Sequence, residues 1–259
     1  MAGWHDLALR APILKQWRER RQREFQVGDI VLDAPHPPVS KSVRKSLRKN
    51  EYEPVEAYLV RRLVRAGDTV LDLGSGLGLT CIAAAKVSRG GRVVGYEADP
   101  AIAPLAQRNV AKNGVQAEIR NRAIAEQQGV CEFHVRRSFT ASSVLPSKRS
   151  RAIRVEADAF RDVVEELQPQ VIACDVEGVE RDVFASANLS SVQRLVVEVH
   201  PGAIGIAGVL KCAQDLANSG LLPVHPLCFG QVLVFDRDGS ASSIEPFRLE
   251  GQTAGNSAG

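Results

Sequence analysis

Residues 68–78 decide the fold of this chain and read Asp68-Thr69-Val70-Leu71-Asp72-Leu73-Gly74-Ser75-Gly76-Leu77-Gly78. A short apolar run leads into three glycines at alternate positions, and an apolar segment from Leu79 to Val87 follows. This pattern predicts a strand, a tight turn and a helix, because glycine permits sharp turns and lets backbone N–H groups approach a ligand. Asp72 lies two residues before the first glycine, where its carboxylate is placed to meet the cationic end of that ligand.

The spacing of these glycines distinguishes two kinds of nucleotide-binding turn. A dinucleotide-binding turn needs glycine or alanine where Leu79 stands. The pattern D-x-G-x-G-x-G instead resembles motif I of the class I S-adenosylmethionine-dependent methyltransferases. A second acidic residue, Glu97, ends the β-rich run from Arg92 to Tyr96, where a carboxylate can accept both hydroxyls of an adenosine ribose. A chance alternation of glycines in an ordinary loop is the alternative, and the strand, the helix and Glu97 together argue against it.

Composition predicts one substantial core. The chain has 259 residues, of which 44% are hydrophobic. We expect a catalytic domain over residues 51–250, a basic N-terminal extension and flap over residues 1–50, and a disordered tail over residues 251–259. Five separated cysteines without a C-x-x-C pair indicate reduced thiols rather than disulfides or a zinc site. The first residues lack a signal-peptide core and no run reaches the length of a membrane span, so we expect a cytoplasmic protein without a membrane partner.

Positive charge gathers at the front of the chain. Residues 1–50 hold eleven Lys and Arg against five Asp and Glu, a balance of +6 that leaves −3 for the remainder. The segment from Ser40 to Lys49 looks too basic for a core element and is predicted to be a mobile flap. A second basic region spans residues 136–154 and is a candidate substrate lid. Both regions favour a ligand with phosphate or carboxylate groups, and a solvated surface is the equally weighted alternative.

The rest of the chain alternates apolar strands with amphipathic helices. A helix is expected to begin at Glu53-Pro54, so that Glu53 and Glu56 could approach the cofactor's amino-acid end, although surface capping carboxylates are commoner at a helix start. A third strand is expected near residues 117–121. Such alternation predicts a parallel sheet with right-handed crossovers. Asn121, Arg122 and Ala123 follow the third strand and are the candidates for adenine contact. Asp158 is predicted to cap a helix, and the last two strands are too close in sequence for a helical crossover, which predicts a hairpin.

Acidic residues and a histidine follow two later strands. Asp175, Glu177 and Glu180 come after the strand 171–174, and His200 comes after the strand 195–199. Helix-start carboxylates and a structural histidine are the alternatives. Because the carboxyl ends of parallel strands bind ligands in open α/β sheets, we predict that Asp175 positions the donor or takes a proton and that His200 is the general base. Glu177 and Glu180 would orient these groups, and no metal is expected.

The region from Glu53 to about Pro201 resembles the FkbM family of methyltransferases. The resemblance rests on Tyr52-Glu53-Pro54, the glycine turn, Tyr96-Glu97-Ala98-Asp99-Pro100, the Ser142–Leu145 loop, Asp175-Val-Glu-Gly-Val-Glu180 and Glu198-Val199-His200-Pro201. It implies a Rossmann-like fold, namely a mostly parallel seven-stranded sheet with helices on both faces and a C-terminal antiparallel hairpin. It also implies S-adenosylmethionine as methyl donor and, usually, methylation of a hydroxyl on a small molecule or sugar. The predicted cofactor-binding residues are Glu53, Asp72, Gly74, Ser75, Gly76, Gly78, Glu97, Ala98, Asn121, Arg122, Ala123 and Asp175.

Two other functions remain open at this point. A nucleic-acid methyltransferase would use the basic regions to hold phosphates, but aromatic residues make up only 5% of the chain and no base-stacking platform is evident. A non-catalytic S-adenosylmethionine-binding protein is the other alternative, which the intact Asp72, Glu97 and Asp175 disfavour. We therefore expect an O-methyltransferase acting on a small molecule, with a phosphate or carboxylate on the acceptor. The sequence does not determine the oligomeric state.

Overall fold

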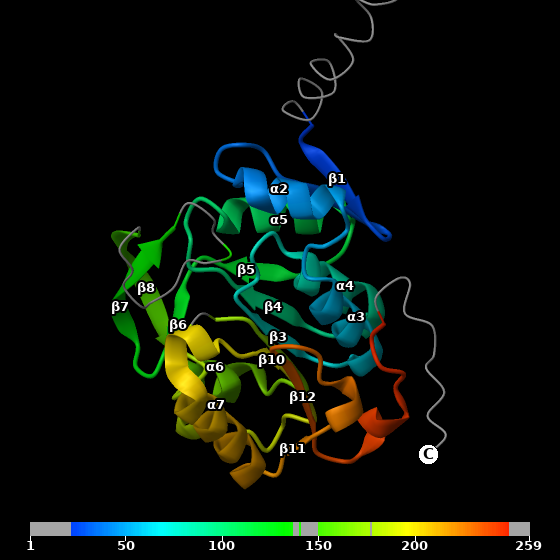
Figure 1. Cartoon of the computed structure of the whole chain (residues 1–259), viewed down its shortest axis with the longest axis vertical. Helices are drawn as coiled ribbons and strands as arrows, with labels where there is room; N and C mark the ends of the chain where they lie inside the picture. Colours follow the sequence, from blue (N-terminus) through cyan, green and yellow to red (C-terminus); the bar gives the residue numbers. More distant parts are fainter. Residues whose placement is uncertain (1–21, 137–139, 141–149, 177, 249–259) are drawn as a thin grey trace, which may run out of the picture.

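A seven-stranded sheet forms the centre of the molecule (Figure 1). The computed structural model describes residues 22–136, 140, 150–176 and 178–248. The strand order is β11-β12-β10-β9-β3-β4-β5, in which β12 pairs antiparallel with both β10 and β11, and the strands from β10 to β5 are parallel. The predicted fold class is therefore confirmed, including the C-terminal hairpin.

The elements of the large sheet and its helices have the following bounds. The strands are β3 (Val70–Leu73), β4 (Val93–Tyr96), β5 (Glu118–Arg120), β9 (Val171–Cys174), β10 (Arg194–Glu198), β11 (Leu222–Pro223) and β12 (Val232–Asp236). The helices are α3 (Pro54–Leu63), α4 (Leu79–Ser88), α5 (Ala103–Lys112), α6 (Phe160–Leu167) and α7 (Pro201–Asn218), with short 3₁₀ turns at Phe184–Ser186, His225–Leu227 and Ser240–Ser243.

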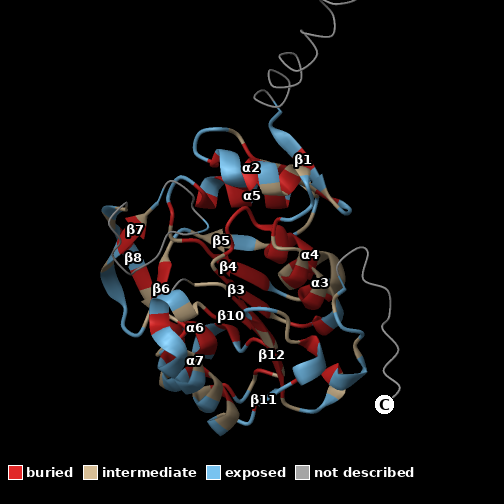
Figure 2. Cartoon of the chain, viewed as in Figure 1, coloured by how far each residue is buried: buried red, intermediate tan, exposed pale blue. Residues whose placement is uncertain are grey.

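Helices cover both faces of this sheet because its strands are apolar on both sides. Leu71 and Leu73 of β3 pack with residues of α6 and α7 in one cluster, whereas Val70 packs with residues of α3 and α4 in another. Successive side chains of a strand point to opposite faces, so a strand buried on both faces needs a continuous apolar run. Figure 2 shows the resulting layer of buried strands between the helices.

A small second sheet lies beside the first and contains β6 (Ala123–Ala125), β8 (Arg151–Ala159) and β7 (Gly129–Val135) in that order. Strand β7 pairs antiparallel with β8 over its whole length. The prediction that Asp158 caps α6 is wrong. Strand β8 continues to residue 159, and the Asp158 carboxylate accepts hydrogen bonds from Arg122 Nε at 2.8 Å and from the Tyr96 hydroxyl at 3.2 Å.

The basic segment near the front of the chain is part of the core, so the prediction of a flap is wrong. Residues 41–48 form the helix α2 (Lys41–Arg48), and Ser40 caps it by accepting the Val43 N–H at 3.2 Å. Val43 and Leu47 lie one turn apart and are 4% and 1% exposed. They join one cluster with the antiparallel pair β1 (Glu24–Val27) and β2 (Ile30–Asp33) and with apolar residues of α4 and α5. The predicted boundary between residues 50 and 51 therefore cuts through a packed unit.

Two other expectations concern thiols and membranes. All five cysteines are free, and Cys81, Cys174 and Cys212 are buried, as the sequence predicts. Within the residues that the structure describes, no helix is long and apolar enough to cross a membrane. The predicted tail, residues 251–259, lies outside the described residues.

The packing of α2 generates a stability prediction. Replacing Leu47 by alanine removes buried methyl groups and leaves a cavity, so we expect the free energy of unfolding to fall by about 2–4 kcal/mol in urea denaturation. Lys45→Ala is the matched control, because Lys45 is exposed on the same helix, and should change it by less than about 0.5 kcal/mol. Equal, small effects of both substitutions would show that α2 is not packed as described.

Candidate active site

The glycine turn is held against two neighbouring strands. The N–H groups of Gly74 and Ser75 both donate to the Tyr96 carbonyl at 2.9 Å, which joins the turn to the end of β4. On the other side, a Cβ added at Gly74 would lie 1.9 Å from the carbonyl oxygen of Asp175. Only glycine fits there, and its φ of +85° is also one that glycine adopts without strain. Gly78, with φ of +84°, is the N-cap residue that precedes α4.

Glu97 connects the end of β4 to the glycine turn. One carboxylate oxygen accepts the Gly76 N–H at 2.8 Å and the other accepts the Asp99 N–H at 2.7 Å. Each oxygen keeps a further lone pair, so the group can still accept hydrogen bonds from a ligand. Burial raises the pKa of Glu97 to about 7, against the lowering effect of these two hydrogen bonds.

Asp72 lies at the buried end of β3, just before the turn. Its carboxylate accepts a hydrogen bond from the Cys81 thiol at 3.1 Å, and burial raises its pKa to about 6. Ser75, only 1% exposed, directs its hydroxyl to the Asp72 carbonyl at 3.3 Å. The structure thus gives the Ser75 side chain a role within the turn, and its contact with the cofactor stays a prediction.

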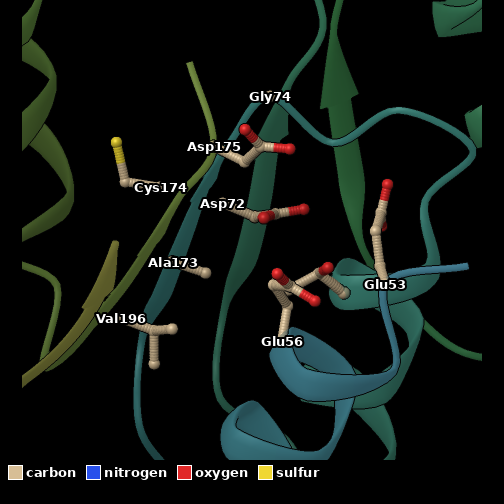
Figure 3. A pocket seen from close by; sticks show the side chains of 9 residues that line it. Glu53, Glu56, Asp72, Gly74, Ala173, Cys174, Asp175 and Val196 are labelled. Atoms are coloured by element: carbon tan, nitrogen blue, oxygen red, sulfur yellow. The ribbon is translucent and has the colours of Figure 1, made fainter. Parts of the chain in front are cut away.

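A cavity beside the turn brings together carboxylates from separate elements (Figure 3). It is lined by Glu53, Glu56, Asp72, Gly74, Thr80, Ala173, Cys174, Asp175 and Val196. Figure 3 shows four of these carboxylates, from α3 and its start and from the ends of β3 and β9, around the same space. No lysine or arginine is among these lining residues, so the cavity favours a cationic group.

Two of these carboxylates come from the start of α3. Burial raises the pKa of Glu53 well above its usual value, and the negative charge of Asp175 raises it further. A hydrogen bond from Tyr52, whose hydroxyl also accepts the Leu77 N–H at 3.4 Å, opposes this rise. Glu53 has φ of +46°, which is uncommon for a residue other than glycine and is often found at functional sites. The pKa of Glu56 is also raised, first by burial and further by the negative charge of Glu198.

Asp175, Glu180 and His200 meet at the adjoining strand ends. Nε2 of His200 lies 3.4 Å from an Asp175 oxygen, and Nδ1 lies 3.2 Å from an oxygen of Glu180. Glu180 is fully buried and also accepts the backbone N–H groups of His200 at 3.0 Å and Gly178 at 2.7 Å. The structure therefore brings three of the four predicted catalytic residues together. Glu177 and the Ser142–Ser143 loop lie outside the described residues.

The predicted adenine contacts have structural partners of their own. The Asn121 side-chain amide donates to the Glu97 carbonyl at 2.8 Å, so it supports the strand end that carries Glu97 and Ala98. Arg122 is paired with Asp158 and Glu156 of β8, and Ala123 begins β6. Asn121 is thus placed close to the predicted ribose-binding residue, whereas Arg122 is held toward the small sheet. Their contact with adenine stays a prediction.

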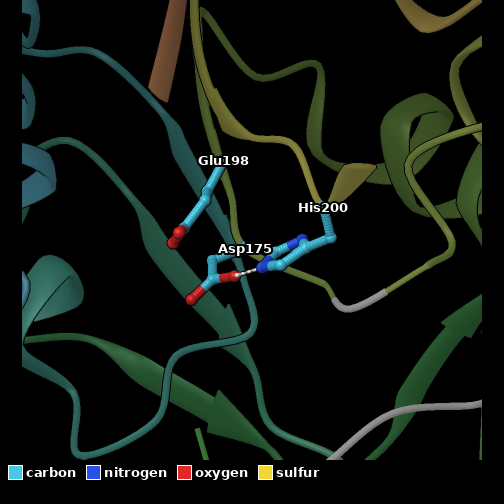
Figure 4. Close-up of side chains that lie close together, drawn as sticks. All are labelled: Asp175, Glu198 and His200. Carbon is cyan, nitrogen blue, oxygen red and sulfur yellow. Dashed lines mark ion pairs between the residues drawn. The ribbon is translucent and has the colours of Figure 1, made fainter. Parts of the chain in front are cut away.

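Two carboxylates of the site, Glu56 and Glu198, are not among the site residues predicted from the sequence. Glu56 is weighed beside Glu53 in the sequence but is not among the predicted cofactor-binding residues, because acidic residues are common in the first turn of a helix. Glu198 was quoted only as part of a motif, although it precedes His200 by two residues at a strand end and therefore shares its side of the sheet. Figure 4 shows the side chains of Asp175, Glu198 and His200 pointing toward one another.

The residues present fit S-adenosylmethionine. The turn has no room for a Cβ at Gly74, Glu97 can accept from ribose hydroxyls, and the cavity presents carboxylates to an ammonium and a sulfonium. Glu97, Asp72 and Glu53 would hold the ribose and the amino-acid end. The strand order and this site together define the class I methyltransferases that depend on S-adenosylmethionine.

The comparisons with known proteins identify the family. A family model described as the methyltransferase FkbM domain matches residues 72–210, which is more than half of the chain. The chain belongs to this family, and S-adenosylmethionine is its cofactor.

Similar proteins include two ribosomal protein L11 methyltransferases. The one from Thermus thermophilus is 47% identical over 55 residues, or 21% of each chain, and the one from Pelotomaculum thermopropionicum is 27% identical over 157 residues, or 61% of this chain and 43% of the relative. The matched part thus spans less than half the length of these relatives. Among solved structures, the magnesium protoporphyrin IX methyltransferase of Synechocystis is 17% identical, with 91% of this chain and 97% of that chain covered and a TM-score of 0.43.

The raised pKa values predict how cofactor binding depends on pH. Asp72 and Glu97 are protonated in the free protein at pH 5.5 and ionise as the pH rises through about 6 and about 7. Because the ionised carboxylates attract the ligand's ammonium and hydroxyls, affinity for S-adenosylhomocysteine should rise about tenfold between pH 5.5 and 8. Calorimetry at several pH values measures this affinity. In Asp72→Asn, the rise in affinity near pH 6 should be lost. Affinity that falls with pH, or an identical profile in Asp72→Asn, would contradict this account.

Proposed function

We propose that this methyltransferase acts on a hydroxyl of a small molecule, giving a methyl ether. The observation that supports this most is the pairing of His200 with the buried Glu180 at the edge of the cofactor cavity. A neutral hydroxyl is a weak nucleophile and must lose its proton as the methyl group arrives, so the site needs a group that promotes this loss.

The imidazole of His200 has Nδ1 beside Glu180 and Nε2 beside Asp175. An ionised Glu180 can only accept, so the neutral ring carries its proton on Nδ1 and leaves Nε2 as an acceptor. Nε2 lies beside Asp175, which lines the cavity. In the simplest form of this proposal, Nε2 takes the hydroxyl proton directly.

The other residues of the site bind and orient. When bound, S-adenosylmethionine supplies a methyl group that is electrophilic because it is attached to a sulfonium. Glu97 and the glycine turn fix the nucleoside end, while Asp72 and Glu53 fix the amino-acid end. Methyl transfer is an in-line displacement, so most of the rate enhancement comes from holding the acceptor oxygen on the correct line. Asp175, between the turn and His200, is placed to help orient both reactants.

The charges around the cavity restrict where an anionic group of the acceptor can lie. The cavity lining contains four carboxylates and no basic side chain, so a phosphate or carboxylate on the acceptor would have to lie outside it. Basic residues are available at the small sheet, where Arg151 and Arg154 belong to β8. We retain an anionic acceptor as part of the proposal, with its charged group near Arg151 and Arg154; most of the predicted lid, residues 137–139 and 141–149, lies outside the described residues.

A second candidate is methylation of a macromolecule, RNA or protein. The exposed Lys41, Lys45 and Lys49 on and next to α2 give a basic surface that could attract RNA phosphates. The named relatives are ribosomal protein L11 methyltransferases. Methyl transfer to RNA that weakens steeply with salt would favour this candidate over a small molecule.

The proposal is tested with ¹³C-methyl S-adenosylmethionine and a panel of hydroxyl compounds. The chemical shift of the transferred carbon distinguishes an O-methyl from an N-methyl product. With the best acceptor, His200→Ala should lower kcat by about 10²–10⁴ and remove an ionisation from the pH profile, while the affinity for S-adenosylhomocysteine stays unchanged.

His225→Ala is the matched control, because His225 is exposed and is not among the residues that line the cavity, and it should leave kcat unchanged. An N-methyl product would contradict the proposed acceptor. Near-native kcat in His200→Ala would show that this imidazole does not act on the hydroxyl.

A further inference from the structure

Three side chains with metal-binding atoms meet at the carboxyl ends of β9 and β10. They are Asp175, Glu198 and His200, and one ligand atom of each lies within 4.8 Å of the other two (Figure 4). One imidazole nitrogen and two carboxylate oxygens that lie this close together form a ligand set that is common for divalent first-row metals.

The sheet register brings these groups together. Val197 of β10 pairs with Cys174 of β9, so the next residues, Glu198 and Asp175, are neighbours on adjacent strands about 4.8 Å apart. His200 follows Glu198 by two residues and its imidazole turns to the same side. Two carboxylates placed side by side repel each other unless a cation lies between them.

The imidazole is oriented as metal-binding imidazoles usually are. Its Nδ1 is held by Glu180, which is fully buried and is not one of the three candidate ligands. Metal-binding histidines typically donate their second nitrogen to a carboxylate in this manner, which fixes the ring and directs the free nitrogen to the ion. Nε2 is thereby directed to Asp175, 3.4 Å away.

Glu198 has no recorded basic partner among the described residues. Among residues that the structure describes, no hydrogen bond or ion pair to the Glu198 carboxylate is found, and its charge helps to raise the pKa of Glu56. The adjoining cavity lining contains no lysine or arginine. The half-buried Glu198 therefore has the electrostatic surroundings that a bound cation would relieve.

We propose that Asp175, Glu198 and Nε2 of His200 bind one divalent cation. The mixed nitrogen and oxygen ligands favour Mn²⁺, Fe²⁺ or Zn²⁺ over Mg²⁺ and Ca²⁺. The inference rests on the proposed function for its role: the cation would bind the acceptor hydroxyl at an open position and favour loss of its proton to water. His200 then acts on the hydroxyl as a metal ligand, in place of direct proton removal.

The test uses the full chain, freed of metal with a chelator and titrated with Mn²⁺. The electron paramagnetic resonance signal of free Mn²⁺ should decrease until one ion per chain is bound. Glu198→Gln and His200→Ala should each raise the Kd for Mn²⁺ by at least about tenfold, since each removes one of three ligands. Glu165→Gln is the matched control, because this glutamate is exposed on α6, and should leave the Kd unchanged. Circular dichroism confirms that each variant is folded.

The outcomes for the metal site and for the proposed function are separate. Absence of saturable Mn²⁺ binding by the native chain, or equal Kd values in both ligand variants and the control, overturns the metal site. If hydroxyl methylation then continues in the presence of the chelator, the proposed function stands with Nε2 as the base. Mn²⁺ binding that is weakened in the ligand variants supports the site even if no hydroxyl compound is methylated, and that second result would overturn the proposed function alone.

Discussion

The close approach of Gly74 to the Asp175 carbonyl is the contact on which the site depends. Because a Cβ at Gly74 would lie 1.9 Å from that oxygen, any side chain at this position would push the turn away from the end of β9. The absence of a side chain lets the ends of β3, β4 and β9 meet at one edge of the sheet. Asp72 and Asp175 thereby line one cavity, although more than a hundred residues separate them, and Glu97 is bonded to the same glycine turn.

Buried negative charge is the second property of this site. Burial raises the pKa values of Asp72, Glu97 and Glu53, so each ionised carboxylate destabilises the ligand-free fold. These buried carboxylates become favourable in their ionised form only when a cation or a set of hydrogen-bond donors is bound to them. S-adenosylmethionine supplies an ammonium and a sulfonium at one part of the cavity. Asp175 lines the same cavity and lies beside Glu198 and His200, where we propose that a cation binds.

Local patterns in the sequence predicted the fold and the centre of the site. The glycine turn, Glu97 and the last hairpin each depend on residues close together in the chain, whose spacing restricts the backbone directly. The predictions failed where distant contacts decide. The basic composition of residues 40–49 led to the prediction of a flap. The burial of Val43 and Leu47 in α2 instead depends on contacts with β1, β2 and α5. The prediction that Asp158 caps a helix failed because its hydrogen-bond partner, Arg122, is remote in the sequence. For the same reason Glu198 was not predicted as a site residue, because its neighbour Asp175 follows a different strand, β9.

A crystal structure with S-adenosylhomocysteine tests the central claim most directly, that the glycine turn and the carboxylates around it form the cofactor site. The account predicts ribose hydroxyls within hydrogen-bond distance of Glu97 and an ammonium within reach of Asp72 or Glu53. It also predicts that the sulfur faces the side of the cavity formed by Asp175 and His200. A ligand bound away from the turn, or one whose sulfur faces the opposite side from His200, would contradict it.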